Sequence, residues 1–242
     1  MKDAARYDRQ IPLFGEEGQR RLARSTALVV GAGGLGSAVS VYLAVAGVGR
    51  IVVVDGDVVE VSNLNRQILH WPEDLGRPKA ASAADTLRGL NPEVEVEEVP
   101  LFADGRNLPG LVAKADAVVD ALDNFSSRHL LNGAALDADV PLFHGAISGL
   151  DGQATTIIPG ATPCLRCIFP RPPPEEKVPA LGATCGVIGS IQATEVVKHL
   201  TGLGASLAGR LLLWDGLRGG ATRSPWRGTP AARTAADEES FK

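Results

Sequence analysis

The sequence predicts an α/β protein built on a Rossmann-like, doubly wound and mostly parallel sheet. Short apolar runs that suit buried strands alternate with helix-like segments along most of the 242 residues. The first run, 28–30, is followed by glycines in the GxGxxG spacing and by a helix expected over 37–46. The second run, 51–54, ends in Asp55. This strand–turn–helix–strand order is typical of a nucleotide-binding unit.

The glycine motif and Asp55 are the expected nucleotide contacts. Glycine permits a tight turn here and lets a phosphate approach the backbone N–H groups at the start of the helix. A carboxylate about 20 residues beyond such a motif is placed to bind ribose hydroxyls. We therefore expect the nucleotide to lie against Asp55 and the loop that contains Gly31, Gly33, Gly34 and Gly36.

The remaining elements continue the alternation. Helices are expected over 18–23, 78–91, 126–136 and 187–200, the third of them capped by Ser126. Strands are expected over 94–99, 117–122, 140–143, 153–158 and 211–214, with 153–158 extending the sheet antiparallel. One domain is predicted over 1–217, with a proline-rich crossover loop at about 170–185 and a disordered tail over 218–242.

Composition argues against several classes of partner. The formal net charge is −4, whereas a nucleic-acid-binding face is usually basic. The sequence contains no apolar run of about 18 residues and no signal-peptide core at residues 1–7. Three cysteines are too few for a disulfide framework. The sequence therefore predicts a cytoplasmic protein that binds neither nucleic acid nor membrane.

The polar residues that follow the expected strands suit a triphosphate better than a nicotinamide. Arg66 and Lys79 supply two cations, and Asp123 supplies a separate carboxylate at the end of a strand. Protein-bound Mg²⁺ is commonly held by one or two carboxylates together with phosphate oxygens, so Asp123 is the expected ligand. The GxxxxGK[ST] phosphate loop is missing from the sequence, which argues against a P-loop NTPase.

Several ordered motifs resemble the ThiF/MoeB/HesA family, bacterial enzymes related to the adenylation domain of ubiquitin-activating E1. The resemblance covers about residues 5–217. It rests on Arg6-Tyr-Asp-Arg9-Gln10, Gly31-Ala-Gly-Gly-Leu-Gly36, Asp55-Gly-Asp57, Ser62-Asn63-Leu-Asn65-Arg66-Gln67, Gly76-Arg-Pro-Lys79, Asp120-Ala-Leu-Asp123-Asn124 and Gly186-Val-Ile-Gly-Ser-Ile-Gln192.

The resemblance implies an ATP-dependent adenylyltransferase with an E1-like adenylation domain. Its substrate would be a small ubiquitin-like sulfur carrier protein, whose C-terminal Gly-Gly carboxylate attacks the α-phosphate of Mg-ATP and releases pyrophosphate. The family implies that Arg9 reaches the site of the other subunit of a homodimer. The nucleotide, phosphate and Mg²⁺ contacts that it implies are Asp55, Asp57, Asn63, Arg66, Gln67, Lys79, Asp123 and Asn124.

The cysteines depart from the family pattern. Many relatives bind a structural zinc through two CxxC pairs, but this chain has only Cys164 and Cys167 in such a pair. A closed zinc site needs four ligands, so zinc and a metal-free CxxC both stay open. Cys185 lies just before the helix expected from 187, where a helix N-terminus can lower the pKa of a thiol. A reactive thiol and a small buried residue are the two interpretations of Cys185.

Two other functions stay open at this point. One is a catalytically silent E1-like binding partner, and the other is an NAD-dependent oxidoreductase. The sequence does not identify the carrier protein or its pathway, which in this family serves thiamine, molybdopterin, cysteine or natural-product sulfur.

Overall fold

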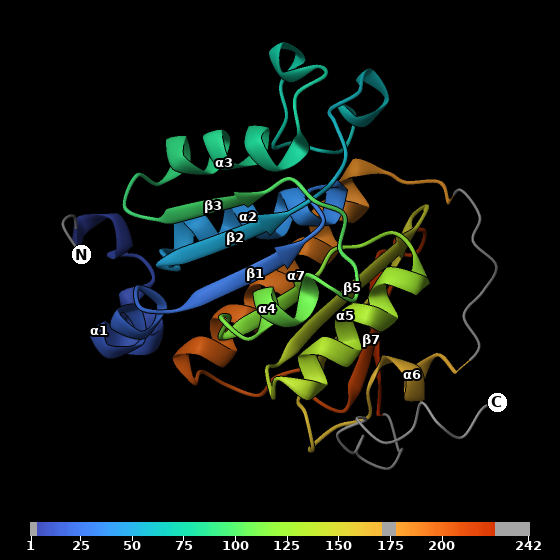
Figure 1. Cartoon of the computed structure of the whole chain (residues 1–242). Helices are drawn as coiled ribbons and strands as arrows, with labels where there is room; N and C mark the ends of the chain where they lie inside the picture. Colours follow the sequence, from blue (N-terminus) through green and yellow to red (C-terminus); the bar gives the residue numbers. More distant parts are fainter. Residues whose placement is uncertain (1–3, 171–177, 226–242) are drawn as a thin grey trace.

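The computed structural model describes residues 4–170 and 178–225. In that part of the chain, eight strands form one sheet in the order β3-β2-β1-β4-β5-β6-β7-β8 (Figure 1). The strands are β1 Thr26–Val30, β2 Arg50–Val54, β3 Glu95–Val99, β4 Ala117–Asp120, β5 Leu142–Ser148, β6 Asp151–Ile157, β7 Arg210–Asp215 and β8 Gly220–Pro225. The helices are η1 Ala4–Tyr7, α1 Ile11–Leu22, α2 Gly34–Ala46, η2 Val61–Asn63, η3 Pro72–Asp74, α3 Lys79–Leu90, α4 Leu108–Val112, α5 Phe125–Asp137, α6 Leu165–Ile168 and α7 Gly182–Thr201.

The pairing of the strands changes once along the sheet, from parallel to antiparallel. Strands β3, β2, β1, β4 and β5 run parallel, and β6, β7 and β8 continue the sheet antiparallel. The chain passes from β1 to β2 on one side, while β4 lies on the other side of β1. This arrangement confirms the predicted doubly wound sheet with an antiparallel extension. It also places a topological switch point between the carboxyl ends of β1 and β4, where ligands bind in open α/β sheets.

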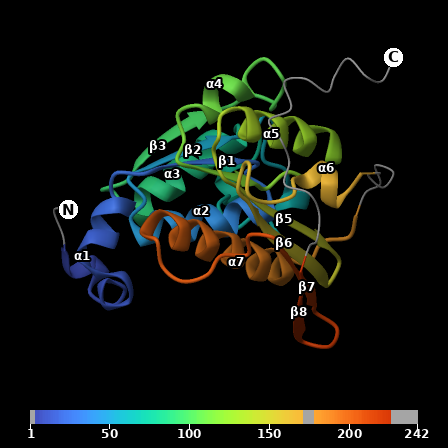
Figure 2. The same cartoon turned by 90° about the horizontal axis from the view of Figure 1, so that it is seen from below.

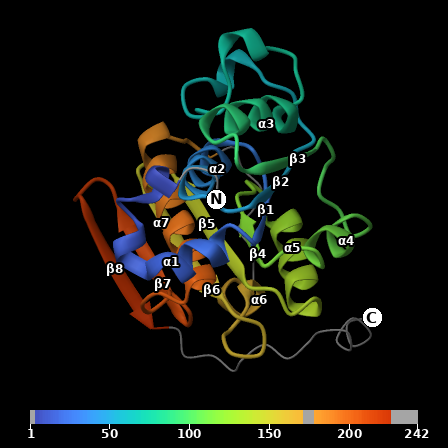
Figure 3. The ribbon, with the colours of Figure 1, turned by 90° about the vertical axis from the view of Figure 1, so that its left-hand side faces the viewer.

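Two hydrophobic cores lie on the two faces of the sheet. Because successive strand residues point to opposite faces, Val29 belongs to the core under α2, α3 and α7, and Leu28 belongs to the core under α4, α5 and α6. Figure 2 and Figure 3 show α2 and α7 on one side of the strands and α4 and α5 on the other. Both faces are covered, which explains why the central parallel strands read as continuous apolar runs.

Helices α2 and α7 pack closely because small residues lie at their contact. A side chain at Gly189 would place its first carbon 2.7 Å from the Ala38 Cβ and 2.9 Å from the Leu35 carbonyl oxygen. The glycine therefore lets the α7 backbone approach α2. This contact holds the start of α7 beside the glycine loop that precedes α2.

Helix boundaries differ from the prediction at three places. Helix α1 begins at Ile11 rather than at 18. The backbone of Gly15 is not helical (φ 72°, ψ 172°), and this kink interrupts the helical periodicity that the sequence shows before residue 18. Asn124, not Ser126, caps α5, since the Asn124 side chain accepts a hydrogen bond from the Ser127 backbone N–H. Helix α7 begins at Gly182, so residues 182–185 are helical and do not belong to a crossover loop.

The prediction of disorder from 218 is wrong for Gly220–Pro225. This segment is β8, paired with β7 in register from Asp215↔Gly220 to Arg210↔Pro225. All six residues are exposed, so the strand has no buried face that would produce an apolar pattern. The rest of the predicted tail, 226–242, and the middle of the predicted crossover loop, 171–177, lie outside the described residues. No helix within the described residues is long and apolar enough to cross a bilayer.

Candidate functional site

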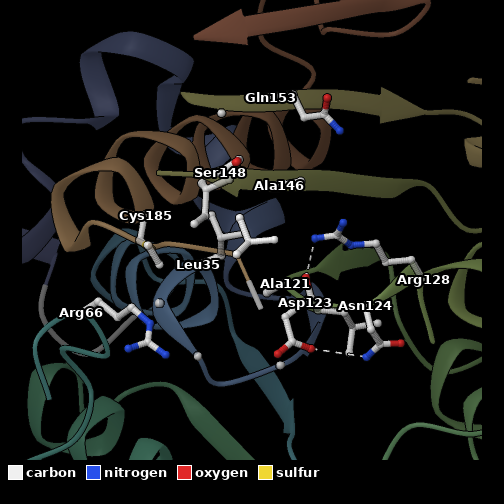
Figure 4. Close-up of a pocket in the computed structure, with 18 of the residues that line it drawn as sticks. Leu35, Arg66, Ala121, Asp123, Asn124, Arg128, Ala146, Ser148, Gln153 and Cys185 are labelled. Atoms are coloured by element: carbon white, nitrogen blue, oxygen red, sulfur yellow. Dashed lines mark hydrogen bonds between the residues drawn. The ribbon is translucent and has the colours of Figure 1, made fainter. Parts of the chain in front are cut away.

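A cavity of about 2000 Å³ opens at the carboxyl ends of the parallel strands. It extends from the glycine loop after β1, past the ends of β2 and β4, to the antiparallel strands β6, β7 and β8. Its position matches the topological switch point of the sheet. Figure 4 shows Arg66 and Asp123 on one side of this cavity and Gln153 across from them. The site therefore combines a nucleotide-type loop with a second region that a nucleotide alone would not fill.

The glycine loop is held in place by backbone geometry and by Asp55. Gly31 has a φ of +104°, and a side chain there would meet the Ala121 carbonyl oxygen at 2.5 Å. One Asp55 carboxylate oxygen accepts from the Ala32 N–H at 2.7 Å, and the other accepts from the Asp57 N–H at 2.9 Å. Burial raises the pKa of Asp55. The loop thus presents its remaining N–H groups at the start of α2, next to this carboxylate.

Lys79 is a buried cation at the cavity wall. Its side chain is 8% exposed, and its Nζ lies 3.0 Å from an Asp57 oxygen. Asp57 itself is half exposed, so this carboxylate can turn toward solvent when another anion approaches Lys79. A buried ammonium group with an exchangeable partner is suited to bind phosphate.

The segment before α3 supplies Arg66 and Gln67 to the cavity, but not Asn63. The Arg66 guanidinium donates to the Ser62 carbonyl oxygen at 2.9 Å and to the Asn65 side-chain oxygen at 3.0 Å. Gln67 is 4% exposed, and its Oε1 has no hydrogen-bond partner among the described residues. Asn63 accepts from the Glu60 N–H and stabilises η2, and it does not line the cavity.

Asp123 follows β4 and faces the cavity from an exposed position. Its carboxylate accepts from the Asn124 side-chain amide at 3.3 Å (Figure 4). Asn124 in turn caps α5, which fixes the amide beside Asp123. The Asp123 carboxylate can therefore take a cation without breaking a buried ion pair.

Arg9 does not line this cavity. It is exposed and lies between η1 and α1. Helix α1 is at the end of the sheet where β1 begins, away from the carboxyl ends of the strands (Figure 1). The described part of one chain therefore brings together every predicted catalytic residue except Arg9.

The three cysteines lie in two different environments. Cys185 lies in the first turns of α7 and lines the cavity, but burial raises the pKa of its thiol and outweighs the opposite influence of Arg66. Of the two interpretations of Cys185, this environment favours the small buried residue. The Sγ atoms of Cys164 and Cys167 are 3.7 Å apart, and no third His, Cys, Asp or Glu of the described residues joins them in a metal-binding group.

Sequence reasoning missed a buried polar group beneath the cavity. Asp120, Arg128 and His144 are each at most 5% exposed and interact with one another, and Gln153 connects them to the cavity wall. In the sequence, Asp120 belongs to the motif Asp120-Ala-Leu-Asp123-Asn124, which does not indicate that its side chain is buried. His144 gave no sequence signal, because a lone histidine in an apolar strand resembles an ordinary core residue.

The fold and the cavity define a nucleotide-binding α/β domain whose cation and carboxylate set suits phosphate chemistry. A model of the ThiF family matches residues 7–233, and the chain belongs to that family. It is 49% identical to the SAMP-activating enzyme E1 of Haloferax volcanii, over 93% of this chain and 86% of that protein. It is 45% identical to the sulfur carrier protein adenylyltransferase of Thermus thermophilus, over 96% of this chain and 91% of that protein. These relatives confirm the family resemblance and make the chain an E1-like adenylyltransferase.

Solved structures confirm the fold. The structure of E. coli MccB with ATP is 24% identical, has a TM-score of 0.84, and is matched over 95% of this chain and 74% of that one. At this identity the likeness concerns the fold.

Proposed function

We propose that this enzyme activates the C-terminal Gly-Gly carboxylate of a small ubiquitin-like sulfur carrier protein as an acyl-adenylate, with release of pyrophosphate. The two relatives are named for activating SAMP and a sulfur carrier protein. The observation that carries the proposal is the cavity that places Asp55, Lys79, Arg66 and Asp123 around the glycine loop. We place this activity in the cytoplasm, as the cysteine usage predicts.

The proposed step needs positioning and charge neutralisation more than proton transfer. An α-carboxylate has a reference pKa of about 3.5 and is ionised at pH 7, so no general base is needed. Its oxygen forms a bond to the α-phosphorus, while the bond from that phosphorus to the bridging oxygen breaks and pyrophosphate leaves. Arg66 and Lys79 would neutralise the phosphate oxygens, and the buried position of Lys79 strengthens this interaction.

Asp123 is the residue that fits a magnesium ion. It is an exposed carboxylate that accepts a hydrogen bond from the neutral side-chain amide of Asn124, so a cation can approach it without displacing a charged group. Mg²⁺ bound in this way takes one or two carboxylates together with substrate phosphates, and it needs no closed cage of protein ligands. When bound, Mg²⁺ would withdraw negative charge from the phosphates. Asp123 would hold it, and Asn124 keeps Asp123 at the end of β4.

We further propose a homodimer in which Arg9 completes the site of the partner subunit. Arg9 is exposed on its own subunit and lies away from its own cavity. A cation supplied in trans would add transition-state stabilisation that one chain lacks.

ATP–pyrophosphate exchange with Gly-Gly carriers tests the proposal. Wild type should exchange only when a carrier is present, Asp123→Ala and Arg9→Ala should each lose at least about tenfold in rate, and the exposed Arg106→Ala should serve as an unchanged control. Mixing the Asp123→Ala and Arg9→Ala proteins should restore activity, because mixed dimers contain one intact site.

Other outcomes would favour the alternatives. Absence of exchange with every carrier, together with tight NAD binding, would refute adenylation in favour of an oxidoreductase. Absence of exchange while ATP still binds would support a catalytically silent partner. Failure of the mixing experiment, with each single variant inactive, would refute the contribution of Arg9 in trans.

A further inference from the structure

We infer that Gln153 is a positioning residue for the carrier, and that its side-chain oxygen accepts a backbone N–H from the extended C-terminal segment of that protein. The inference rests on the proposed function and names one contact of the same site. It begins with the buried group formed by Asp120, Arg128 and His144, which we call the Asp120 cluster.

The Asp120 cluster determines which nitrogen of His144 carries hydrogen. His144 is fully buried, and its Nδ1 lies 2.7 Å from an Asp120 carboxylate oxygen. A carboxylate only accepts hydrogen bonds, so Nδ1 is the N–H donor. Burial lowers the pKa of His144, which favours the neutral ring. The lone pair of that ring is therefore on Nε2.

The lone pair on His144 in turn orients the Gln153 amide. The Gln153 side-chain nitrogen is 3.3 Å from His144 Nε2, and it is the group that can donate to this lone pair. The opposite orientation would place the amide oxygen against the lone pair and would be repulsive. Gln153 Oε1 is consequently directed away from His144, and no group of the described residues donates a hydrogen bond to it. Gln153 lines the cavity (Figure 4).

The same cluster fixes the chain that leads to Asp123. The second Asp120 oxygen accepts from the Leu122 N–H at 3.1 Å, and Arg128 donates to the Leu122 carbonyl oxygen at 2.5 Å. The backbone N–H and carbonyl oxygen of Leu122, the residue before Asp123, are thus both hydrogen-bonded to buried side chains. Gln153 and Asp123 are therefore positioned by one hydrogen-bonded group, although they belong to β6 and to the loop after β4.

The cavity between Gln153 and the glycine loop suits a main chain with small side chains. Ala146 on β5 is the cross-strand partner of Gln153, and Gly152 and Ala180 line the same space. Extended peptide directs N–H groups to alternate sides, so one acceptor can fix its register. An acceptor on β6 would align the last residues of the carrier so that its carboxylate points toward the nucleotide side of the cavity.

The decisive experiment tests the Gln153→Leu variant with carrier proteins that contain a backbone ester. Three semisynthetic carriers would each replace one of the last three amide N–H groups by an ester oxygen, which removes one donor. For the wild-type carrier, Gln153→Leu should raise the KM about 3- to 10-fold and leave the KM for ATP unchanged, as expected for one lost hydrogen bond. One of the three ester carriers should have a higher KM than the all-amide carrier with wild-type enzyme, but the same KM as the all-amide carrier with Gln153→Leu. The other two ester carriers serve as internal controls.

Several results would overturn the inference. These are an unchanged carrier KM in Gln153→Leu, ester effects that are equal in both enzymes, or a ¹⁵N spectrum in which His144 carries its hydrogen on Nε2. Thermal unfolding of Gln153→Leu would show that the variant is folded. If wild type shows no carrier-dependent exchange, the proposed function fails; if it does and Gln153→Leu is unaffected, only this inference fails.

Discussion

Alanine at Gly34 should destabilise the protein through one side chain, that of Cys185. Gly34 is the first residue of α2 and its φ is not positive, so alanine fits the backbone there. Its Cβ, however, would lie 2.6 Å from Cys185 Sγ and 3.2 Å from Cys185 Cβ. The sulfur contact is about 1 Å closer than the usual 3.5–4.0 Å between nonbonded atoms. Overpacking of this kind costs about 1–3 kcal/mol, while replacing glycine by alanine at a compatible site gains about 0.4–1 kcal/mol.

Together, these two effects predict that Gly34→Ala lowers the free energy of unfolding by about 0.5–2 kcal/mol. They also predict that shortening Cys185 restores the lost stability. In a Cys185→Ala background the sulfur is gone and the nearest contact becomes the Cβ of residue 185 at 3.2 Å, so Gly34→Ala should be close to neutral. The free energy of unfolding of the four proteins, from urea titrations, should give a coupling energy of about 0.5–2 kcal/mol.

Gly36→Ala is the matched comparison for this cycle. An alanine Cβ at Gly36 would lie 1.8 Å from the Gly31 carbonyl oxygen, a backbone atom that shortening Cys185 does not remove. Its destabilisation should therefore be larger and the same in both backgrounds. Strictly additive effects of Gly34→Ala and Cys185→Ala would refute the packing argument.

Three further predictions concern helix capping, pH and metal. Asn124→Ala should lower the free energy of unfolding by about 1 kcal/mol in nucleotide-free protein, because the variant loses the cap of α5, and an unchanged urea midpoint would contradict this. Burial lowers the pKa of His70 and His144, so below pH 6.5 these two histidines bind protons in the unfolded chain but not in the folded chain. The free energy of unfolding should therefore fall as the pH drops from 7 to 5.5, by at most about 1.4 kcal/mol per pH unit for each histidine. A free energy of unfolding that does not change with pH would show that both histidines can be protonated in the folded chain. Prolonged EDTA treatment should leave the thermal midpoint unchanged, since Cys164 and Cys167 supply two ligands where a structural zinc needs four; zinc release with a lower midpoint would overturn this expectation.

Local sequence patterns determined the fold class of this protein and the position of its nucleotide site. Apolar runs, glycine spacing and the positions of Asp55 and Asp123 predicted a doubly wound sheet with a nucleotide site, and the structure confirms the sheet and brings these residues together. They could be predicted because each depends on neighbours along the chain: strand periodicity, a tight turn and the start of a helix are short-range properties. The predicted antiparallel extension also followed from a local strand pattern.

Tertiary structure decided everything that depends on distant contacts. Strand β8 forms because β7 offers a free edge, although its own residues are all exposed. The thiol pKa of Cys185 rises because burial beside the glycine loop outweighs the opposite influence of Arg66. His144, Asp120 and Gln153 come from three different strands, or from their ends, and they meet only when the sheet is assembled. These features could not be predicted from the sequence, because burial and hydrogen bonds across the sheet do not depend on the spacing of residues along one segment.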